Sequence, residues 1–328
     1  MSRTATQTSI AYFGKIPSRG DFVKASDNTA LISILDEWLA QTMELLASEP
    51  RWKLLYDAVP PMHFSFIGPR RRHAIAGHMI ASCDKAQRRF PFLLMSAMEI
   101  EAPPAFMAKS PVALLRLWNR LEALSGDVVR AEDPGSALQA VSAASVNLEL
   151  GTPAYDAALA DFLELQSVGA LEAMLAQAGF AGTVRQLVLA LGLLLQPVLS
   201  SGSSRLEKSL VLPLPADPMY RFLVATFWMH LITPFLVRAD FEIAVFLTQI
   251  QERPSMVVGF SGASARTLQA VMDPQVGLTH HIAFDEAQWV EAQVEAEYGL
   301  GKLSSYLAQP QLSLKLAYES FREVFIGA

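Results

Sequence analysis

The sequence predicts an α+β protein in which an antiparallel sheet is flanked by helices. Over residues 28–48 and 111–125, apolar residues recur at the i, i+3, i+4, i+7 spacing of amphipathic helices. Between these segments lie three short runs rich in aromatic and aliphatic residues and separated by turn residues, as strands are. Hydrophobic residues make up 52% of the 328-residue chain and charged residues only 18%, which is enough to build a large core. The predicted N-terminal order is β-α-β-β-β-α.

The first two predicted elements are a strand over Ile10–Ile16 and a helix over Asn28–Ser48. The helix has one apolar face, and Asp27 or Asn28 is placed to accept a hydrogen bond from a free amide at its N-terminus. Pro60-Pro61 then forces an extended break after the helix.

Three strands are predicted next, at His63–Ile67, His73–Ser82 and Phe92–Ile100. The third is a continuous apolar run, which predicts a central strand covered on both faces. The close spacing of the three strands favours an antiparallel meander, because parallel strands need longer connections.

A second helix is predicted over Pro111–Ser125, and Gly126 is expected to end it. Pro111 suits the first turn of this helix, because the N–H that proline lacks has no partner there. We therefore expect residues 1–130 to form an α+β domain, residues 131–204 a segment of three or four helices, and residues 205–328 an α/β portion. The sequence leaves open whether this last portion completes the first sheet or forms a domain of its own.

The last portion of the chain shows both strand and helix patterns. Strands are predicted at Ser209–Leu214, Phe241–Ile250, Met256–Phe260 and His280–Phe284. Helices are predicted at Met219–Val237, Ala263–Met272, Glu286–Tyr298 and Leu312–Ile326.

Composition and charge exclude several classes of protein. Lys and Arg number 26 against 32 Asp and Glu, and a net charge of −6 lacks the basic footprint of a nucleic-acid binder. One cysteine, Cys83, forbids an intrachain disulfide and a zinc site with two Cys ligands, so we expect a cytoplasmic protein. The polar N-terminus lacks the apolar core of a secretory signal. The apolar run Phe222–Val237 is shorter than the ~20 residues of a transmembrane helix, so we expect no integral membrane segment.

The densest local signal is FGKIPSRGDF, residues 13–22. Two glycines, a proline and an Arg-Gly-Asp tripeptide predict a shaped loop between the first strand and the first helix. We expect Gly14 and Gly20 to adopt backbone conformations that are costly for other residues, and Asp21 to cap a turn or pair with Arg19. A Walker A phosphate loop is excluded, because its first glycine and its Ser or Thr are missing.

This loop resembles the start of the TagF family, also called ImpM, which is associated with type VI secretion. Members begin with Gly-Lys-Leu-Pro-x-Arg-Gly-Asp-Phe, and the matching residues here are Gly14, Lys15, Pro17, Arg19, Gly20, Asp21 and Phe22. The family's Trp-Leu pair on a helix is matched by Trp38 and Leu39. Its Asp-x-x-Gly-Arg-x-Phe-Pro-Leu segment is matched at Asp84, Arg88, Phe90 and Pro91. In that segment, Gln87 replaces the Gly and Phe92 the Leu.

The resemblance covers residues from about 10 to 125 and implies a regulator rather than an enzyme. TagF-like proteins look like cytoplasmic post-translational repressors of type VI secretion assembly, which are thought to engage the forkhead-associated scaffold protein of that system. The residues that match the family motifs are therefore the candidate partner-binding site. The resemblance implies no cofactor, and the oligomeric state is left open.

A second candidate surface is the basic cluster of Arg70, Arg71 and Arg72, to which Arg88 and Arg89 would add. Arginine binds carboxylate or phosphate groups in a bidentate way, so the cluster fits an anionic partner. The alternative is a solvated hairpin turn after a Gly-Pro pair.

The six histidines do not predict a metal site. His73 and His78 are five residues apart on a predicted strand, and His280 and His281 are adjacent, so each pair points in opposite directions. His230 lies in an apolar helix and is expected to be a core residue.

The strongest enzyme signal is GFSGA at residues 259–263, between a predicted strand and a predicted helix, as in the nucleophile elbow of a serine hydrolase. Asp273 and then His280 or His281 would complete a Ser-Asp-His order. However, Ala263 occupies the last Gly position, and a serine that caps the following helix explains the same residues. We therefore expect no enzyme, with a serine hydrolase acting through Ser261 as the alternative.

Overall fold

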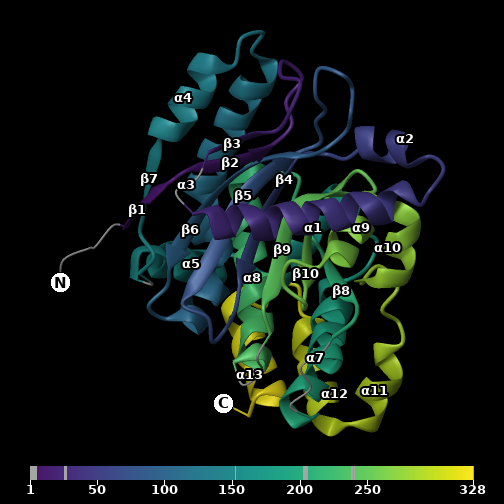
Figure 1. Ribbon diagram of the computed structural model, residues 1–328. Coiled ribbons are helices and arrows are strands. Elements are labelled where there is room, and N and C mark those ends of the chain that lie inside the picture. The colour runs from purple at the N-terminus through teal and green to yellow at the C-terminus, as the bar shows by residue number, and fades with distance from the viewer. Residues whose placement is uncertain are drawn as a thin grey trace.

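The computed structural model describes residues 6–25, 28–151, 153–201, 206–237, 239 and 241–327, and it confirms the α+β fold (Figure 1). Nine strands form one large sheet. In chain order they are β2 (Ala11–Gly14), β3 (Val23–Ala25), β4 (Met62–Ile67), β5 (His73–Ile80), β6 (Phe92–Glu99), β8 (Ser209–Pro213), β9 (Ile243–Ile250), β10 (Arg253–Gly259) and β11 (His281–Ala283). Their spatial order is β11-β8-β10-β9-β4-β5-β6-β2-β3. Neighbouring strands are antiparallel except β8 and β11, which are parallel.

The predicted order of the N-terminal elements is confirmed, with three additions. A short strand, β1 (Thr6–Ser9), pairs with β7 (Ser145–Leu148) in a separate two-stranded sheet. The strand β3 and a short helix, α2 (Trp52–Asp57), were not predicted. Helix α1 (Thr29–Ala47) begins as expected, because the Asn28 side chain accepts a hydrogen bond from the amide of Leu31 (3.0 Å). Asp27, the alternative cap, lies outside the described residues.

Helix α3 (Pro103–Arg130) is longer than predicted at both ends. A Pro-Pro pair begins it, Pro111 lies in its interior, and Gly126 does not end it. Pro111 has no N–H to donate to the carbonyl of Met107, which accepts a hydrogen bond from the Ser110 hydroxyl instead (3.0 Å).

The neighbouring helix α8 (Pro218–Leu236) satisfies other backbone groups around this proline. The amide of Val112 donates to Oγ1 of Thr226 (3.2 Å), and Nδ1 of His230 donates to the carbonyl of Ala108 (3.0 Å). Burial lowers the pKa of His230, which favours the neutral ring. His230 therefore has the core role that the sequence predicts.

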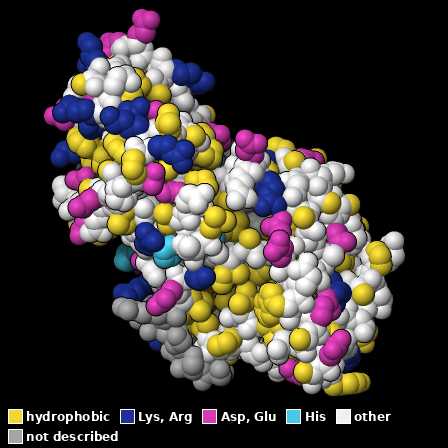
Figure 2. All heavy atoms as spheres, turned by 90° about the vertical axis from the view of Figure 1, so that its right-hand side faces the viewer, with side chains coloured by type: hydrophobic (Ala, Val, Ile, Leu, Met, Phe, Trp, Pro, Cys, Tyr) yellow, Lys and Arg dark blue, Asp and Glu magenta, His cyan; other side chains and the backbone are white. Residues whose placement is uncertain are grey.

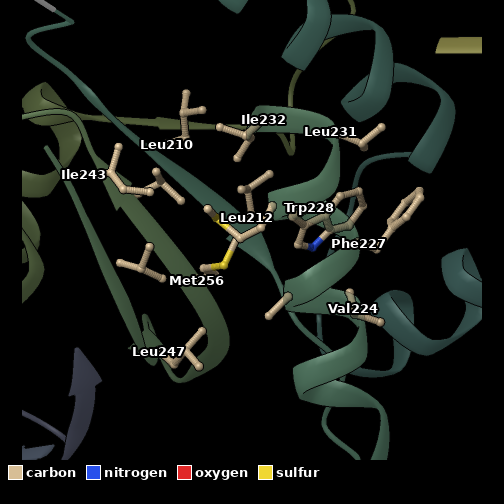
Figure 3. Packing of buried hydrophobic residues seen from close by; sticks show 14 of the residues in the cluster. Leu210, Leu212, Val224, Phe227, Trp228, Leu231, Ile232, Ile243, Leu247 and Met256 are labelled. Carbon is tan, nitrogen blue, oxygen red and sulfur yellow. The ribbon is translucent and has the colours of Figure 1, made fainter. Parts of the chain in front are cut away.

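The large sheet has a hydrophobic core on each face. Helices α1 and α9 (Ala265–Met272) pack on the face turned to the viewer in Figure 1. Helices α3 and α8 pack on the opposite face. Figure 3 shows Trp228 of α8 lying toward Leu212 and Met256 of the sheet, whereas Phe227 lies on the other side of the helix. The indole Nε1 of Trp228 donates to the carbonyl of Pro213 (2.9 Å), so its polar atom is satisfied.

The remaining helices lie at the ends of the sheet and behind α8. They are α4 (Gly135–Ala143), α5 (Pro153–Leu165), α6 (Val168–Gln177), α7 (Val184–Ser201), α10 (Pro274–His280), α11 (Val290–Ala296), α12 (Tyr298–Leu307) and α13 (Leu314–Phe325). In the described part of the segment 131–204 there are four helices, where three or four were predicted, together with the strand β7. Helices α10 and α12 were not predicted. In the part of the chain that the structure describes, no helix combines the length and hydropathy that crossing a membrane requires.

The two ends of the chain share the large sheet. Strand β4 pairs with β9, with Phe64 opposite Phe246 and Ser65 opposite Val245. The C-terminal portion therefore completes the N-terminal sheet, which settles the question that the sequence left open. The domain boundaries near residues 130 and 204 stay predictions, and the second of them falls at residues 202–205, outside the described residues.

Candidate functional site

Two loops that are distant in the sequence meet at the top of the molecule in Figure 1. One follows β2 (residues 15–22) and the other joins β5 to β6 (residues 81–91). They meet because β2 pairs with β6, with Gly14 opposite Phe92. We call this region the motif site, and it consists of Gly14, Lys15, Pro17, Arg19, Gly20, Asp21, Phe22, Asp84, Arg88, Phe90 and Pro91.

Backbone hydrogen bonds hold the two loops together. The amide of Lys15 donates to the carbonyl of Pro91 (3.4 Å), and the amide of Lys85 donates to the carbonyl of Arg19 (2.8 Å). Pro17 lies in a tight turn closed by a hydrogen bond from the amide of Arg19 to the carbonyl of Ile16 (3.1 Å). Proline suits the second position of such a turn, because its ring fixes φ near the required value.

The two glycines of the first loop differ. Gly14 has a φ of +131°, and a Cβ atom there would lie 2.0 Å from the carbonyl oxygen of Pro91. Glycine is therefore required where β2 passes β6. Gly20 has no atom within 4 Å of the position of a Cβ and no positive φ. The expectation of a costly conformation is wrong for Gly20, because its loop turns in open space.

Asp84 lies at the centre of the motif site, with its side chain fully buried. Its Oδ1 accepts hydrogen bonds from the amides of Ala86 and Arg88 (both 2.9 Å). Its Oδ2 lies 2.6 Å from Nε of Arg88 and 3.1 Å from Nζ of Lys15. Burial alone would raise the pKa of Asp84, but these hydrogen bonds and the Lys15 charge hold it at about 2. Asp84 is thus ionised and anchors both loops.

Gln87 occupies the position where the family motif has glycine. Its φ is +60°, in the left-handed region that favours glycine. Its amide donates to the carbonyl of Asp84 (2.8 Å), which closes a tight turn. The turn is therefore retained although the glycine is missing.

An aromatic cluster covers one side of the motif site. The ring of Phe22 stacks on Phe13 (5.5 Å between centroids) and meets the edge of Phe90 (4.9 Å). The ammonium of Lys15 lies 5.0 Å from the centre of the Phe22 ring, in a cation–π contact. Phe13 and Phe90 are buried, whereas Phe22 is 41% exposed. An aromatic side chain is therefore held rigidly at the surface.

The charged residues of the Arg-Gly-Asp tripeptide do not pair with each other. The guanidinium of Arg19 lies 3.5 Å from a carboxylate oxygen of Asp133, and both side chains are well exposed. Asp21 accepts a hydrogen bond from the amide of Phe22 (2.8 Å). Of the two alternatives expected for Asp21, capping a turn or pairing with Arg19, the pairing with Arg19 is therefore wrong. Arg88 reaches back across the loop instead and donates to the carbonyl of Gly20 (2.7 Å).

Trp38, together with its neighbour Leu39 of the family's Trp-Leu pair, lies outside the motif site. The Trp38 side chain is 2% exposed. It lies on the buried face of α1 and packs against Phe64, Phe66 and Phe246 of the sheet. It therefore belongs to the core on that face of the sheet and is inaccessible to a partner.

The basic cluster is split by the fold. Residues 70–72 form an exposed turn between β4 and β5, with Arg72 lying 3.6 Å from Glu99. Arg88 and Arg89 lie at the other end of β5, because β5 runs antiparallel to β6 over its whole length. Arg89 is held in a bidentate pair by Asp57 (2.7 and 2.6 Å). The expectation that all five arginines form one surface is therefore wrong.

The candidate elbow residues have other partners. Ser264, not Ser261, caps α9 by accepting from the amide of Thr267 (3.3 Å). Asp273 is buried and caps α10. Nε2 of His281 donates to a backbone carbonyl (3.0 Å), and His280 accepts from Arg266 (2.6 Å).

Metal ligands do not gather in the part of the chain that the structure describes, where no three His, Cys, Asp or Glu side chains are placed to hold an ion. Sequence reasoning missed Phe13, Lys85 and Asp133, which complete the motif site. Phe13 borders the motif, but no local signal points to Asp133, which approaches Arg19 only through the tertiary fold.

Comparison with known proteins identifies the class of protein that this arrangement belongs to. Residues 11–144 match the family model described as TagF N-terminal domain, type VI secretion system-associated. This confirms the TagF resemblance: the chain carries a TagF N-terminal domain, a domain described as type VI secretion system-associated.

One solved structure with a limited likeness is the crystal structure of PA0076 from Pseudomonas aeruginosa PAO1. It is 21% identical, with a TM-score of 0.36, and the match covers 43% of this chain and 65% of that chain. No curated protein matches the chain.

Proposed function

We propose that this chain is a cytoplasmic post-translational repressor of type VI secretion that binds the forkhead-associated scaffold protein of that system. The observation that supports the proposal is the TagF N-terminal domain over residues 11–144, in which the motif residues of two loops converge on one site. Buried Asp84 fixes the two loops, and Phe22 and Arg19 are presented to solvent. Aromatic and Arg side chains are enriched at the centres of protein interfaces. Lys and Arg side chains also gather on the upper part of the molecule in Figure 2.

The direct test is calorimetry with the purified forkhead-associated scaffold. Phe22→Ala should weaken binding at least tenfold, because a rigid aromatic anchor loses its contact area on both sides of the interface. Tyr306→Ala is the matched control, since Tyr306 is 39% exposed, close to the 41% of Phe22, and lies on α12. Wild-type protein that does not bind the scaffold would contradict the proposal. Equal affinity of the two variants would exclude the motif site as the interface.

The turn at residues 70–72 is a second surface for the same partner. Its three exposed arginines would speed encounter with an acidic or phosphorylated surface and make binding salt-sensitive. A triple Arg→Ala change should weaken binding more at low salt than at high salt, with an unchanged melting curve. If affinity and salt dependence both stay at wild-type values, the turn is simply solvated.

We also propose that the chain has no hydrolase activity. Ser261→Ala should match wild type in every assay, because the residues expected to complete a triad are bonded elsewhere. A fluorophosphonate probe should leave Ser261 unlabelled. Esterase or amidase turnover that disappears in Ser261→Ala would show that the hydrolase alternative is right.

A further inference from the structure

A cavity of about 660 Å³ lies at the β8–β11 edge of the sheet, and no residue of the motif site lines it. Its floor includes Val211 and Pro213 of β8 and Ala283 of β11. Ala283 pairs with Val211, so these side chains share one face of the sheet. The floor of the cavity is therefore apolar.

The helices α2, α9 and α10 and the turn between β9 and β10 form the walls of the cavity. Leu54 and Ala58, at α2, lie on one side, and Met272 and Leu278, at α9 and α10, lie on another. Leu54 is 69% exposed and Leu278 is 67% exposed. Figure 2 looks onto the side that carries α2 and α10 and shows hydrophobic side chains reaching its surface. Large exposed apolar side chains around a hollow are typical of a binding site.

Two of the three charged side chains in the lining, Arg253 and Asp285, pair with each other, and the third, Glu252, is exposed. Nη1 of Arg253 lies 2.6 Å from Asp285 and also donates to the carbonyl of Gly179 (3.0 Å). Arg253 is the only Lys or Arg in the lining, all of which the structure describes. His281 donates from Nε2 to the carbonyl of Ala270 (3.0 Å), and burial lowers its pKa, which favours the neutral ring. No cation is therefore free to bind an acidic ligand.

We propose that this cavity binds an uncharged, largely apolar small molecule. The volume lies within the ~300–1,000 Å³ range of small-molecule sites, which are mostly apolar with a few polar groups that fix orientation. An anionic ligand would lose its hydration without gaining an opposite charge, because Arg253 is already paired with Asp285. This inference is independent of the scaffold-binding function.

The test is a fluorescence titration of the full-length protein with the uncharged dye N-phenyl-1-naphthylamine. We expect one saturable site, and we expect the anionic dye 1-anilinonaphthalene-8-sulfonate to bind at least tenfold more weakly. Ala58→Trp, at a wall, and Ala283→Trp, at the floor, fill the cavity from exposed positions, so each should weaken binding of the uncharged dye at least tenfold. Ala160→Trp, at an exposed position on α5, is the control and should bind as wild type does.

Three results would overturn the proposal. They are the absence of saturable binding of the uncharged dye, unchanged binding in both cavity-filling variants, and equal affinity for the anionic dye. Melting curves are recorded for every variant, and variants at two separate places of the lining keep the test decisive if one of them does not fold.

Discussion

Gly14 links the backbone of the motif site to the large sheet. A side chain at this position would require a left-handed φ and would also meet the carbonyl of Pro91. Gly14→Ala should therefore destabilise the protein by about 2–4 kcal/mol, from backbone strain and overpacking together. The measurement is the free energy of unfolding in urea. Gly20→Ala is the control and should change it by about 0.5 kcal/mol or less, since a Cβ there contacts nothing. Equal effects would mean that the β2–β6 approach can relax.

Gln87 lies in the β5–β6 loop of the motif site, where a change to glycine is expected to stabilise the protein. A non-glycine residue in the left-handed region costs about 1–2 kcal/mol, and the extra flexibility of unfolded glycine returns roughly half of that. Gln87→Gly should therefore stabilise the protein by about 0.5–1 kcal/mol. Gln87→Ala keeps the unfavourable φ and should not stabilise it. If Gln87→Gly has a lower melting temperature than wild type, the Gln87 side chain stabilises the folded protein by more than its left-handed backbone destabilises it.

Strands β4 and β5 carry a pair of histidines, His78 buried and His63 largely buried, beneath α3. Nδ1 of His63 lies 3.0 Å from Nδ1 of His78, and the His63 ring stacks on Trp118. Burial lowers the pKa of His63 to about 3 and that of His78 to about 4. For His63, the neighbouring His78 and Arg221 contribute to this lowering, after burial. A carboxylate oxygen of Glu122 lies 3.7 Å from Nε2 of His63, but this side chain is mostly exposed, and the pKa of His63 stays lowered.

This pair predicts how stability depends on pH. Both pKa values are lower in the folded protein than in the unfolded chain, where they are near 6.5, so the unfolded state binds more protons below pH 6.5. Stability should therefore fall from pH 6.5 towards pH 3. The double variant His63→Gln, His78→Gln should lose less stability between pH 7 and pH 4.5, as measured by urea unfolding. Parallel pH profiles of the two proteins would contradict a buried neutral pair.

Periodicity predicted the long elements because burial on one face leaves a readable pattern, as in α1 and in strands β4, β5 and β6. It failed at Pro111, because the helix continues only with hydrogen bonds supplied by Ser110 and by Thr226 and His230 of α8. Short helices such as α2 and α10 have too few turns to show a period. The motif residues could be found from the sequence, but their meeting depends on the long-range β2–β6 register.

At the scale of the whole molecule, the TagF N-terminal domain ends at residue 144, but the sheet does not end there. A fragment of residues 1–144 would leave one edge of β4 without β9 and the apolar face of α3 without α8. We expect this fragment to lack a cooperative thermal transition by circular dichroism, whereas the full chain unfolds cooperatively. Adding residues 145–328 in trans should restore the transition. A fragment that melts cooperatively alone would show that the matched region is an independent folding unit.

The contact between β4 and β9 also sets the timing of folding during synthesis. The hydroxyl of Thr248 donates to the carbonyl of Pro61, and these residues are 187 positions apart in the chain. At about 5–20 residues per second, a ribosome needs roughly 10–40 s to make the chain between them. During that interval the nascent β4 has an open edge that can pair with other chains. Closing so long a loop is also slow. Newly made protein is therefore expected to depend on chaperones until its last third has emerged.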